Sequence, residues 1–77
     1  MKVQVFAALK DYFEKEFEVA GNVQDVEALK QHLLELNGAA GNMLKICRFA
    51  VGDEFVDQSF QLKETDTVCV IPPSSGG

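Results

Sequence analysis

One amphipathic segment constrains the fold of this chain more than any other feature. Four apolar residues recur at spacings of three, four and three, which places them in a single stripe on a helix: Val26, Leu29, Leu33 and Leu36. Asp25 precedes the stripe as a preferred N-cap, and Asn37-Gly38 follows it as a stop signal. A chain of 77 residues has room for one core, so we expect this helix to cover that core.

Two segments before the helix have the alternating pattern of strands. In the first, Lys2 to Ala8, Val3, Val5 and Ala7 lie on one face, and Gln4 and Phe6 on the other. Leu9 to Phe13 is expected to form a turn of helix or a 3₁₀ segment. The second strand carries Phe17 and Val19 on one face and ends at Gly21-Asn22.

The segments after the helix predict a hairpin and a final strand. We expect a loop over Gly38 to Gly41 and a third strand over Cys47 to Val51, with Arg48 on the face opposite Phe49. Gly52-Asp53 predicts a tight turn into a short strand over residues 54–56.

The last strand is expected over residues 67–71, after a polar turn at 63–66, with Val68 and Val70 facing inward. Strand, strand, helix and three further strands predict an α+β roll. Its mixed sheet of about five strands would be packed by one main helix. The domain is expected to span residues 1–71, followed by a tail over 72–77.

Charge and composition narrow the classes of partner. Twelve acidic and seven basic residues give a net charge of −5, which disfavours nucleic acid and anionic membrane surfaces. A partner with a basic docking face suits this charge, and simple solubility is the alternative explanation. Met1-Lys2 runs directly into the first strand without a leader, and no apolar run reaches the length of a membrane span.

The two cysteines indicate a reducing compartment and no metal centre. Cys47 and Cys69 are too few for a disulfide framework. They show no CxxC spacing, and His32 is distant in sequence, so we expect no bound metal. The sequence therefore predicts a cytoplasmic protein whose cysteines are small core or sheet residues.

The C-terminal segment is the most informative motif. Pro72 and Pro73 cannot donate ladder hydrogen bonds, so the sheet is expected to end there, and two consecutive prolines favour a stiff, extended start. Ser74, Ser75, Gly76 and Gly77 have nothing to bury and are expected to reach clear of the domain. A diglycine end has no Cβ to block a narrow enzyme channel, which predicts that the terminal carboxylate reacts. A frayed terminus is the alternative.

On these residues the whole chain resembles the ubiquitin-like β-grasp sulfur carriers, and in particular the MoaD-like small subunits of molybdopterin synthase. Five stretches carry the resemblance: residues 3–7, 26–32, 49–53, 62–68 and 71–77, the last of which ends in Pro-Pro-Ser-Ser-Gly-Gly. Two turn positions depart from the family pattern, since Gly52 stands where Asn is common and Thr65 where Gly is common. The sibling thiazole-pathway carriers tend to be shorter and to lack the two prolines.

The resemblance implies that chemistry occurs at the chain end. An E1-like enzyme would adenylate the Gly77 carboxylate with ATP, and a sulfur donor protein would convert the adenylate to a thiocarboxylate. The tail would then enter the large synthase subunit, which would supply the catalytic side chains in a heterotetramer. The carrier itself would be no enzyme and would bind no cofactor.

Four residues are candidates for the partner interface. Phe6 lies on the outward face of the first strand by its period, and Phe55 and Ile71 fall where the family places interface residues. For Phe6 and Phe55 the alternative is a core position. Arg48 would pair with an acidic group of a partner, or would simply be solvated.

Three other functions remain open at this stage. The chain could serve thiazole synthesis or another sulfur-transfer pathway, or it could be a ubiquitin-like modifier that joins Gly77 to lysines. It could also be a binding module whose Gly-Gly end has no chemical role.

Overall fold

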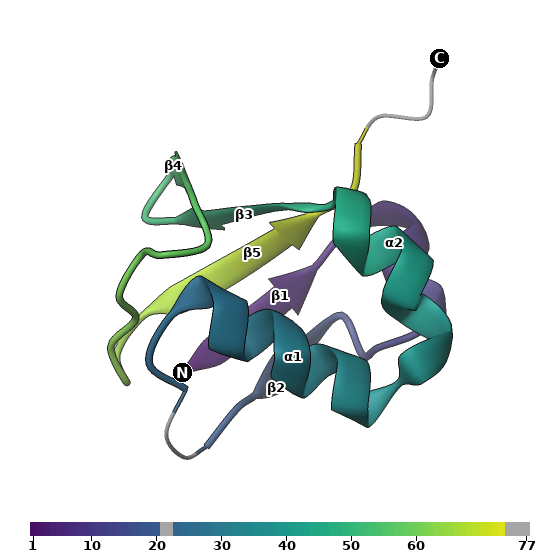
Figure 1. The fold of residues 1–77 in the computed structure, drawn as a ribbon, viewed down its shortest axis with the longest axis horizontal. Coiled ribbons are helices and arrows are strands. Elements are labelled where there is room, and N and C mark those ends of the chain that lie inside the picture. The colour runs from purple at the N-terminus through teal and green to yellow at the C-terminus, as the bar shows by residue number, and fades with distance from the viewer. Residues whose placement is uncertain (21–22, 74–77) are drawn as a thin grey trace.

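A computed structural model describes residues 1–20 and 23–73 of the chain. Its five-stranded sheet has the order β2-β1-β5-β3-β4 (Figure 1). The strands are β1 (Lys2–Val5), β2 (Glu16–Glu18), β3 (Arg48–Val51), β4 (Glu54–Val56) and β5 (Thr67–Ile71). The helical elements are η1 (Ala7–Asp11), α1 (Val26–Leu36), η2 (Gly38–Ala40) and α2 (Gly41–Ile46). This arrangement confirms the predicted α+β roll with a mixed sheet.

The first and last strands form the centre of the sheet. β1 pairs with β5 in parallel, Val3 beside Val68 and Val5 beside Val70. The other three pairs are antiparallel: β1 with β2, β3 with β4, and β3 with β5. The strand ladder therefore depends on residues at the two ends of the domain.

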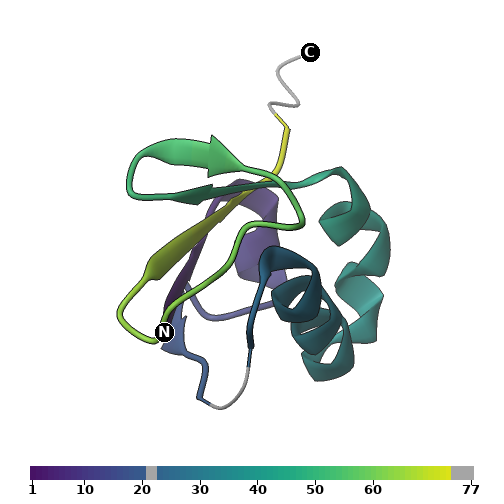
Figure 2. The same ribbon diagram turned by 60° about the vertical axis from the view of Figure 1, so that its left-hand side comes forward.

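The helices cover one face of this sheet and leave the other face open (Figure 2). The core forms where α1 meets the inward side chains of β1 and β5, and its most deeply buried members are Val3, Val5, Leu9, Val26, Leu29, Leu33, Leu44, Val68 and Val70. Three residues of the predicted stripe are buried as expected. The fourth, Leu36, was wrongly placed in the core: it ends α1 and is 56% exposed.

The start of α1 is fixed by hydrogen bonds to distant backbone. Asp25 is the predicted N-cap, and its Oδ1 accepts from the Ala28 N–H at 2.8 Å. The N–H groups of Val26 and Glu27 donate to carbonyl oxygens of residues 60 and 58, at 3.2 and 3.0 Å. Since these first-turn donors have no partner within the helix, the connector before β5 holds α1 in register with the sheet.

The predicted loop over Gly38 to Gly41 is wrong, because the chain forms η2 and then α2 there. Ala40 and Leu44 are fully buried and bring this second helix onto the core. A Cβ on Gly41 would lie 3.3 Å from Cδ2 of Leu34, so glycine permits the close approach of α2 to α1. The backbone N–H of Cys47 caps α2, and β3 therefore begins one residue later than predicted.

The first strand is shorter than predicted. Ala7 has φ of 54°, a left-handed conformation that takes the chain out of the sheet after Phe6 and into η1. Ala7 therefore does not share the buried face of Val3 and Val5, and it is exposed. The 3₁₀ segment predicted over Leu9 to Phe13 is present two residues earlier, as η1.

The remaining turns agree with the sequence. Gly52 and Asp53 both have positive φ, 57° and 70°, as a two-residue hairpin turn requires. The N–H of Lys63 donates to Oδ2 of Asp66 at 2.8 Å and closes the polar turn before β5. Phe17 lies in β2 and Val19 is buried just beyond it, whereas the predicted strand end at Gly21-Asn22 lies outside the described residues.

Within residues 1–20 and 23–73, every helix falls short of the length and apolar character that a bilayer crossing needs.

The second helix gives a test of the fold. We expect Leu44→Ala to lower the free energy of unfolding by about 2–5 kcal/mol, because it opens a cavity in the core. Ile46→Ala, in the same helix but 57% exposed, should cost less than about 0.5 kcal/mol. Urea unfolding followed by circular dichroism measures both, and equal losses would contradict the packing of α2.

Candidate functional site

The chain leaves the sheet at a defined edge. β5 ends at Ile71, and Pro72 is buried while Pro73 is exposed, so the chain leaves the body between the two prolines (Figure 1). The predictions for Ser74, Ser75, Gly76 and Gly77 lie outside the described residues. The structure therefore fixes where the C-terminal segment starts.

The four predicted interface residues gather around this exit point. Since Val5 pairs with Val70 in parallel strands, Phe6 directly after β1 and Ile71 at the end of β5 lie at the same end of the sheet. Ile71 also pairs with Arg48 across β3. The Arg48 guanidinium lies over the Phe55 ring, with its carbon 4.4 Å from the ring centroid. We call Phe6, Arg48, Phe55 and Ile71 the tail-end face.

The tail-end face is accessible. Phe6 is 42% exposed and Phe55 57% exposed, so the alternative that either is a core residue is wrong. Arg48 is exposed and Ile71 is half-buried. The guanidinium–ring contact preorders Arg48 without removing its N–H donors from a partner's reach. Exposed aromatic side chains beside an arginine are the residue types that dominate protein–protein binding energy.

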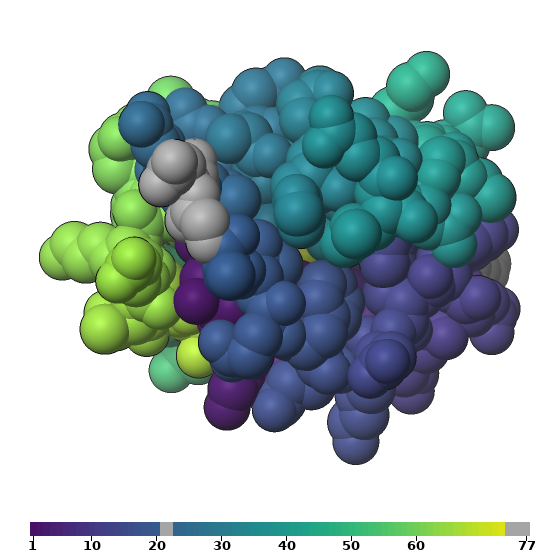
Figure 3. Space-filling model, turned by 90° about the horizontal axis from the view of Figure 1, so that it is seen from below, coloured from purple at the N-terminus to yellow at the C-terminus, as the bar shows by residue number. Residues whose placement is uncertain are grey.

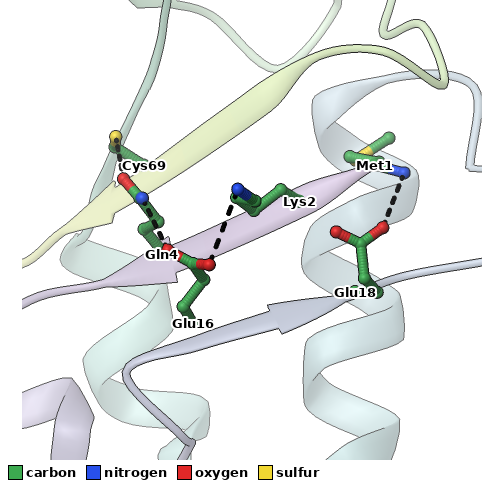
Figure 4. Close-up of polar contacts among 6 residues, drawn as sticks. All are labelled: Met1, Lys2, Gln4, Glu16, Glu18 and Cys69. Carbon is green, nitrogen blue, oxygen red and sulfur yellow. Dashed lines mark hydrogen bonds and ion pairs between the residues drawn. The ribbon is translucent and has the colours of Figure 1, made fainter.

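A row of cross-strand neighbours continues this face across the open side of the sheet. It runs through Glu16, Gln4, Cys69, Ala50 and Phe55. Gln4 Nε2 donates to Glu16 Oε1 at 2.9 Å, and the Cys69 thiol donates to Gln4 Oε1 at 3.6 Å (Figure 4). The hydrogen bond from Gln4, with the nearby charge of Lys2, lowers the pKa of Glu16.

No sequence motif singles out Gln4 and Cys69 as a connected pair. The period of each strand places both on the outward face, but only the register brings them together. At the far end of β1, the amino group of Met1 pairs with Glu18 at 3.7 Å (Figure 4). Polar contacts among β1, β2 and β5 therefore lie on the part of the open sheet face that is away from Phe55.

A second exposed apolar region lies away from the tail. Phe13 and Phe17 stack with ring centroids 6.0 Å apart and, with His32 and Leu36, line a hollow of about 350 Å³. Figure 3 shows this end of the molecule, where residues 11–20, coloured purple to blue, lie along α1. Among residues 1–20 and 23–73, no three side chains of His, Cys, Asp or Glu gather as metal ligands would.

Comparison with known proteins agrees with this geometry. The model of the ThiS family matches residues 3–77, which is nearly the whole chain. The chain belongs to the ThiS family. A relative from Chlamydomonas reinhardtii, the molybdopterin synthase sulfur carrier subunit, is 36% identical over 77 aligned positions. That alignment covers 86% of this chain and 93% of the algal protein.

Two solved structures show the same fold as this ThiS-family chain. The first comes from a complex of subunits 1 and 2 of the molybdopterin-converting factor from Helicobacter pylori, at a TM-score of 0.71 and 27% identity. It covers 99% of this chain and 96% of that one. The second, SAMP1 from Haloferax volcanii, has a TM-score of 0.80 at 16% identity over 99% and 97% of the two chains. The ubiquitin-like β-grasp fold predicted for this family is therefore confirmed.

The thiols of this ThiS-family chain are protected. Burial raises the pKa of Cys47, against an opposing effect of the Lys30 charge, and its Sγ donates to the Met43 carbonyl at 3.0 Å. Burial also raises the pKa of Cys69, to which the negative charge of Asp53 adds. Both cysteines are free and half-buried.

These shifts predict slow alkylation at neutral pH. A raised thiol pKa lowers the thiolate fraction at pH 7, so the rate with iodoacetamide should rise with a midpoint above the ordinary value of about 8.5. Cys47→Ser and Cys69→Ser variants separate the two thiols. A midpoint below that ordinary value for either thiol would contradict the protected environment.

Proposed function

We propose that this chain is a sulfur carrier, the small subunit of a molybdopterin synthase, whose Gly77 carboxylate becomes a thiocarboxylate. One observation carries the proposal: an exposed face of two phenylalanines and an arginine surrounds the point where the chain leaves the body toward Gly-Gly. Membership of the ThiS family and likeness to the algal carrier subunit support it.

The proposed loading reaction has two steps. The Gly77 carboxylate attacks the α-phosphorus of ATP in an E1-like enzyme, which releases pyrophosphate and leaves an acyl-adenylate. A sulfur donor protein then delivers sulfur at the sulfide level to the acyl carbon. AMP departs with one former carboxylate oxygen, and the chain ends as a thiocarboxylate. ATP is therefore used by the partner enzyme and is not a cofactor of this chain.

The body of the carrier contributes recognition and reach. The tail-end face would dock on the enzyme while buried Pro72 anchors the start of the tail and Pro73 directs it outward. Gly76 and Gly77 have no Cβ and so pass a narrow channel toward a reacting centre. The catalytic side chains for sulfur insertion would belong to the large subunit, which makes this chain a sulfur donor and no enzyme.

The partners of the proposed carrier follow from this scheme. They are the E1-like adenylating enzyme, the sulfur donor protein and the large synthase subunit, the last in a heterotetramer. The Helicobacter pylori neighbour was solved as a complex of subunits 1 and 2 of the molybdopterin-converting factor, which supports a large-subunit partner. We place the protein in the cytoplasm, where ATP is present and free thiols such as Cys47 and Cys69 stay reduced.

Intact-mass measurement tests the loading step. Incubation with the E1-like enzyme of the same organism, ATP and a sulfur source should raise the mass by about 16 Da, because sulfur replaces one oxygen. Deletion of Gly77 should leave the fold unchanged and abolish the gain. No gain with the intact chain would refute the proposal, and higher-mass lysine conjugates would favour a modifier instead.

Substitution on the tail-end face tests docking. We expect Phe6→Ala and Phe55→Ala each to weaken binding of the large subunit by more than about 1 kcal/mol, because both rings would lose their buried contacts. Phe60→Ala is the matched control, since this phenylalanine is 38% exposed in the connector before β5. Isothermal titration calorimetry measures the affinities, and equal losses in all three variants would argue against the tail-end face.

A further inference from the structure

Most basic residues of this acidic chain lie beside the tail-end face. Five of the seven line two hollows on either side of the tail-end face: Lys10, Lys15, Lys30, Lys45 and Arg48. The larger hollow, of about 510 Å³, lies between the start of α1, the end of α2 and the β3–β4 hairpin. We call it the tail-end groove.

The charge of the tail-end groove is opposite to that of the molecule. Lys30, Lys45 and Arg48 give it +3, and Asp57 reduces this to +2. Since the whole chain carries −5, the residues outside the groove carry −7. A local potential of inverted sign directs an approaching acidic group to this site and away from the rest of the surface.

The three cations are available to a partner. Among residues 1–20 and 23–73, none of them lies within ion-pair distance of a carboxylate. The carboxylate in the groove is engaged elsewhere, because Asp57 Oδ1 accepts from the N–H and the hydroxyl of Ser59, at 2.9 and 2.7 Å. Those hydrogen bonds lower the pKa of Asp57 and hold it away from pairing with the lysines.

The lining suits a polypeptide better than a small anion. Val56, which is half-buried, contributes apolar surface between the charged side chains, whereas Val26 and Phe49 also line the groove but are buried in the core. Phe55, more than half exposed, forms one wall. A segment that carries carboxylates and apolar side chains together would satisfy both parts of the groove.

The size of a stable interface also requires contact beyond the tail-end face. A standard interface uses roughly 20–30 residues on each side. The four residues of the tail-end face and residues 72–77 provide only ten. Arg48 and Phe55 belong to both the face and the groove, so the groove is its direct continuation. A permanent subunit needs this added area more than an enzyme that must release the carrier.

We propose that the tail-end groove receives an acidic segment of the large synthase subunit, with Lys30, Lys45 and Arg48 pairing with its carboxylates. This inference rests on the proposed function, which supplies the partner. The smaller hollow, of about 190 Å³ beside Phe6, is lined by Lys10, Lys15 and Glu16 and so carries a net charge of +1. Docking at the tail end is thus steered by charge from both sides.

Single charge reversals test the groove with a matched control. Lys45→Glu and Lys63→Glu each replace an exposed lysine and give the same net charge, but only Lys45 lines the groove. With the large subunit of the same organism at about 50 mM salt, we expect Lys45→Glu to raise the Kd roughly tenfold, mainly through slower association. Lys63→Glu should stay within about twofold, and Lys45→Arg, which keeps the positive charge, should bind as the unchanged chain does.

Salt and a second variant complete the design. The difference between Lys45→Glu and Lys63→Glu should shrink at about 500 mM salt, because ions screen exposed charges. Circular dichroism shows whether Lys45→Glu disturbs α2. If it does, Lys30→Glu tests the same groove from α1. Equal effects of groove and control reversals, or tighter binding by the groove variants, would overturn the inference.

The mass assay separates this inference from the proposed function. Lys45→Glu should still gain about 16 Da with the E1-like enzyme, because its tail is unchanged. If the intact chain gains mass but the groove variants bind the large subunit normally, the groove inference fails alone. If the intact chain gains no mass, the proposed function fails.

Discussion

The parallel pairing of β1 with β5 is the constraint on which the rest of this structure depends. It joins the first and last strands of the domain through Val3, Val5, Val68 and Val70, all at most 2% exposed. A parallel pair needs a long connection, which residues 6–66 form here, and α1 within it covers the inward valines. Because the two strands run in the same direction and end together, the tail-end face and the point where the chain leaves the body lie at one edge of the sheet.

Under the proposed function, the body and the chain end that meet at this edge have different physical requirements. The body must be rigid to be recognised, and it achieves this with α1 fixed by Asp25 and by the connector carbonyls. Under the proposed function the chain end must enter another protein, so it ends in glycines in place of side chains that could pack. The net charge does not describe the local charge, because this acidic chain has most of its basic residues beside the tail-end face. The composition favours a basic partner, whereas the local arrangement favours an acidic one at this edge.

Three sequence expectations failed for physical reasons that lie in the tertiary structure. Residues 38–41 begin and end with glycine, so local signals predicted a loop there, and the six-residue helix that follows, α2, is unstable alone. Burial of Ala40 and Leu44 stabilises the helix instead. Ala7 fits the period of a strand, yet it adopts a left-handed φ at the start of η1, which no local preference of alanine predicts. Leu36 follows the helix stripe but lies where α1 ends, so it remains exposed.

The sequence by itself determined the fold class, the N-cap at Asp25, the Gly52-Asp53 turn and the proline-glycine ending, because each depends on near neighbours in the chain. Strand period was enough to place Phe6 on the outward face. Only the tertiary structure decided that Phe6, Arg48, Phe55 and Ile71 form one face and that Lys30 and Lys45 border it. These side chains come from separate elements, and the register of the sheet and the packing of the helices bring them together.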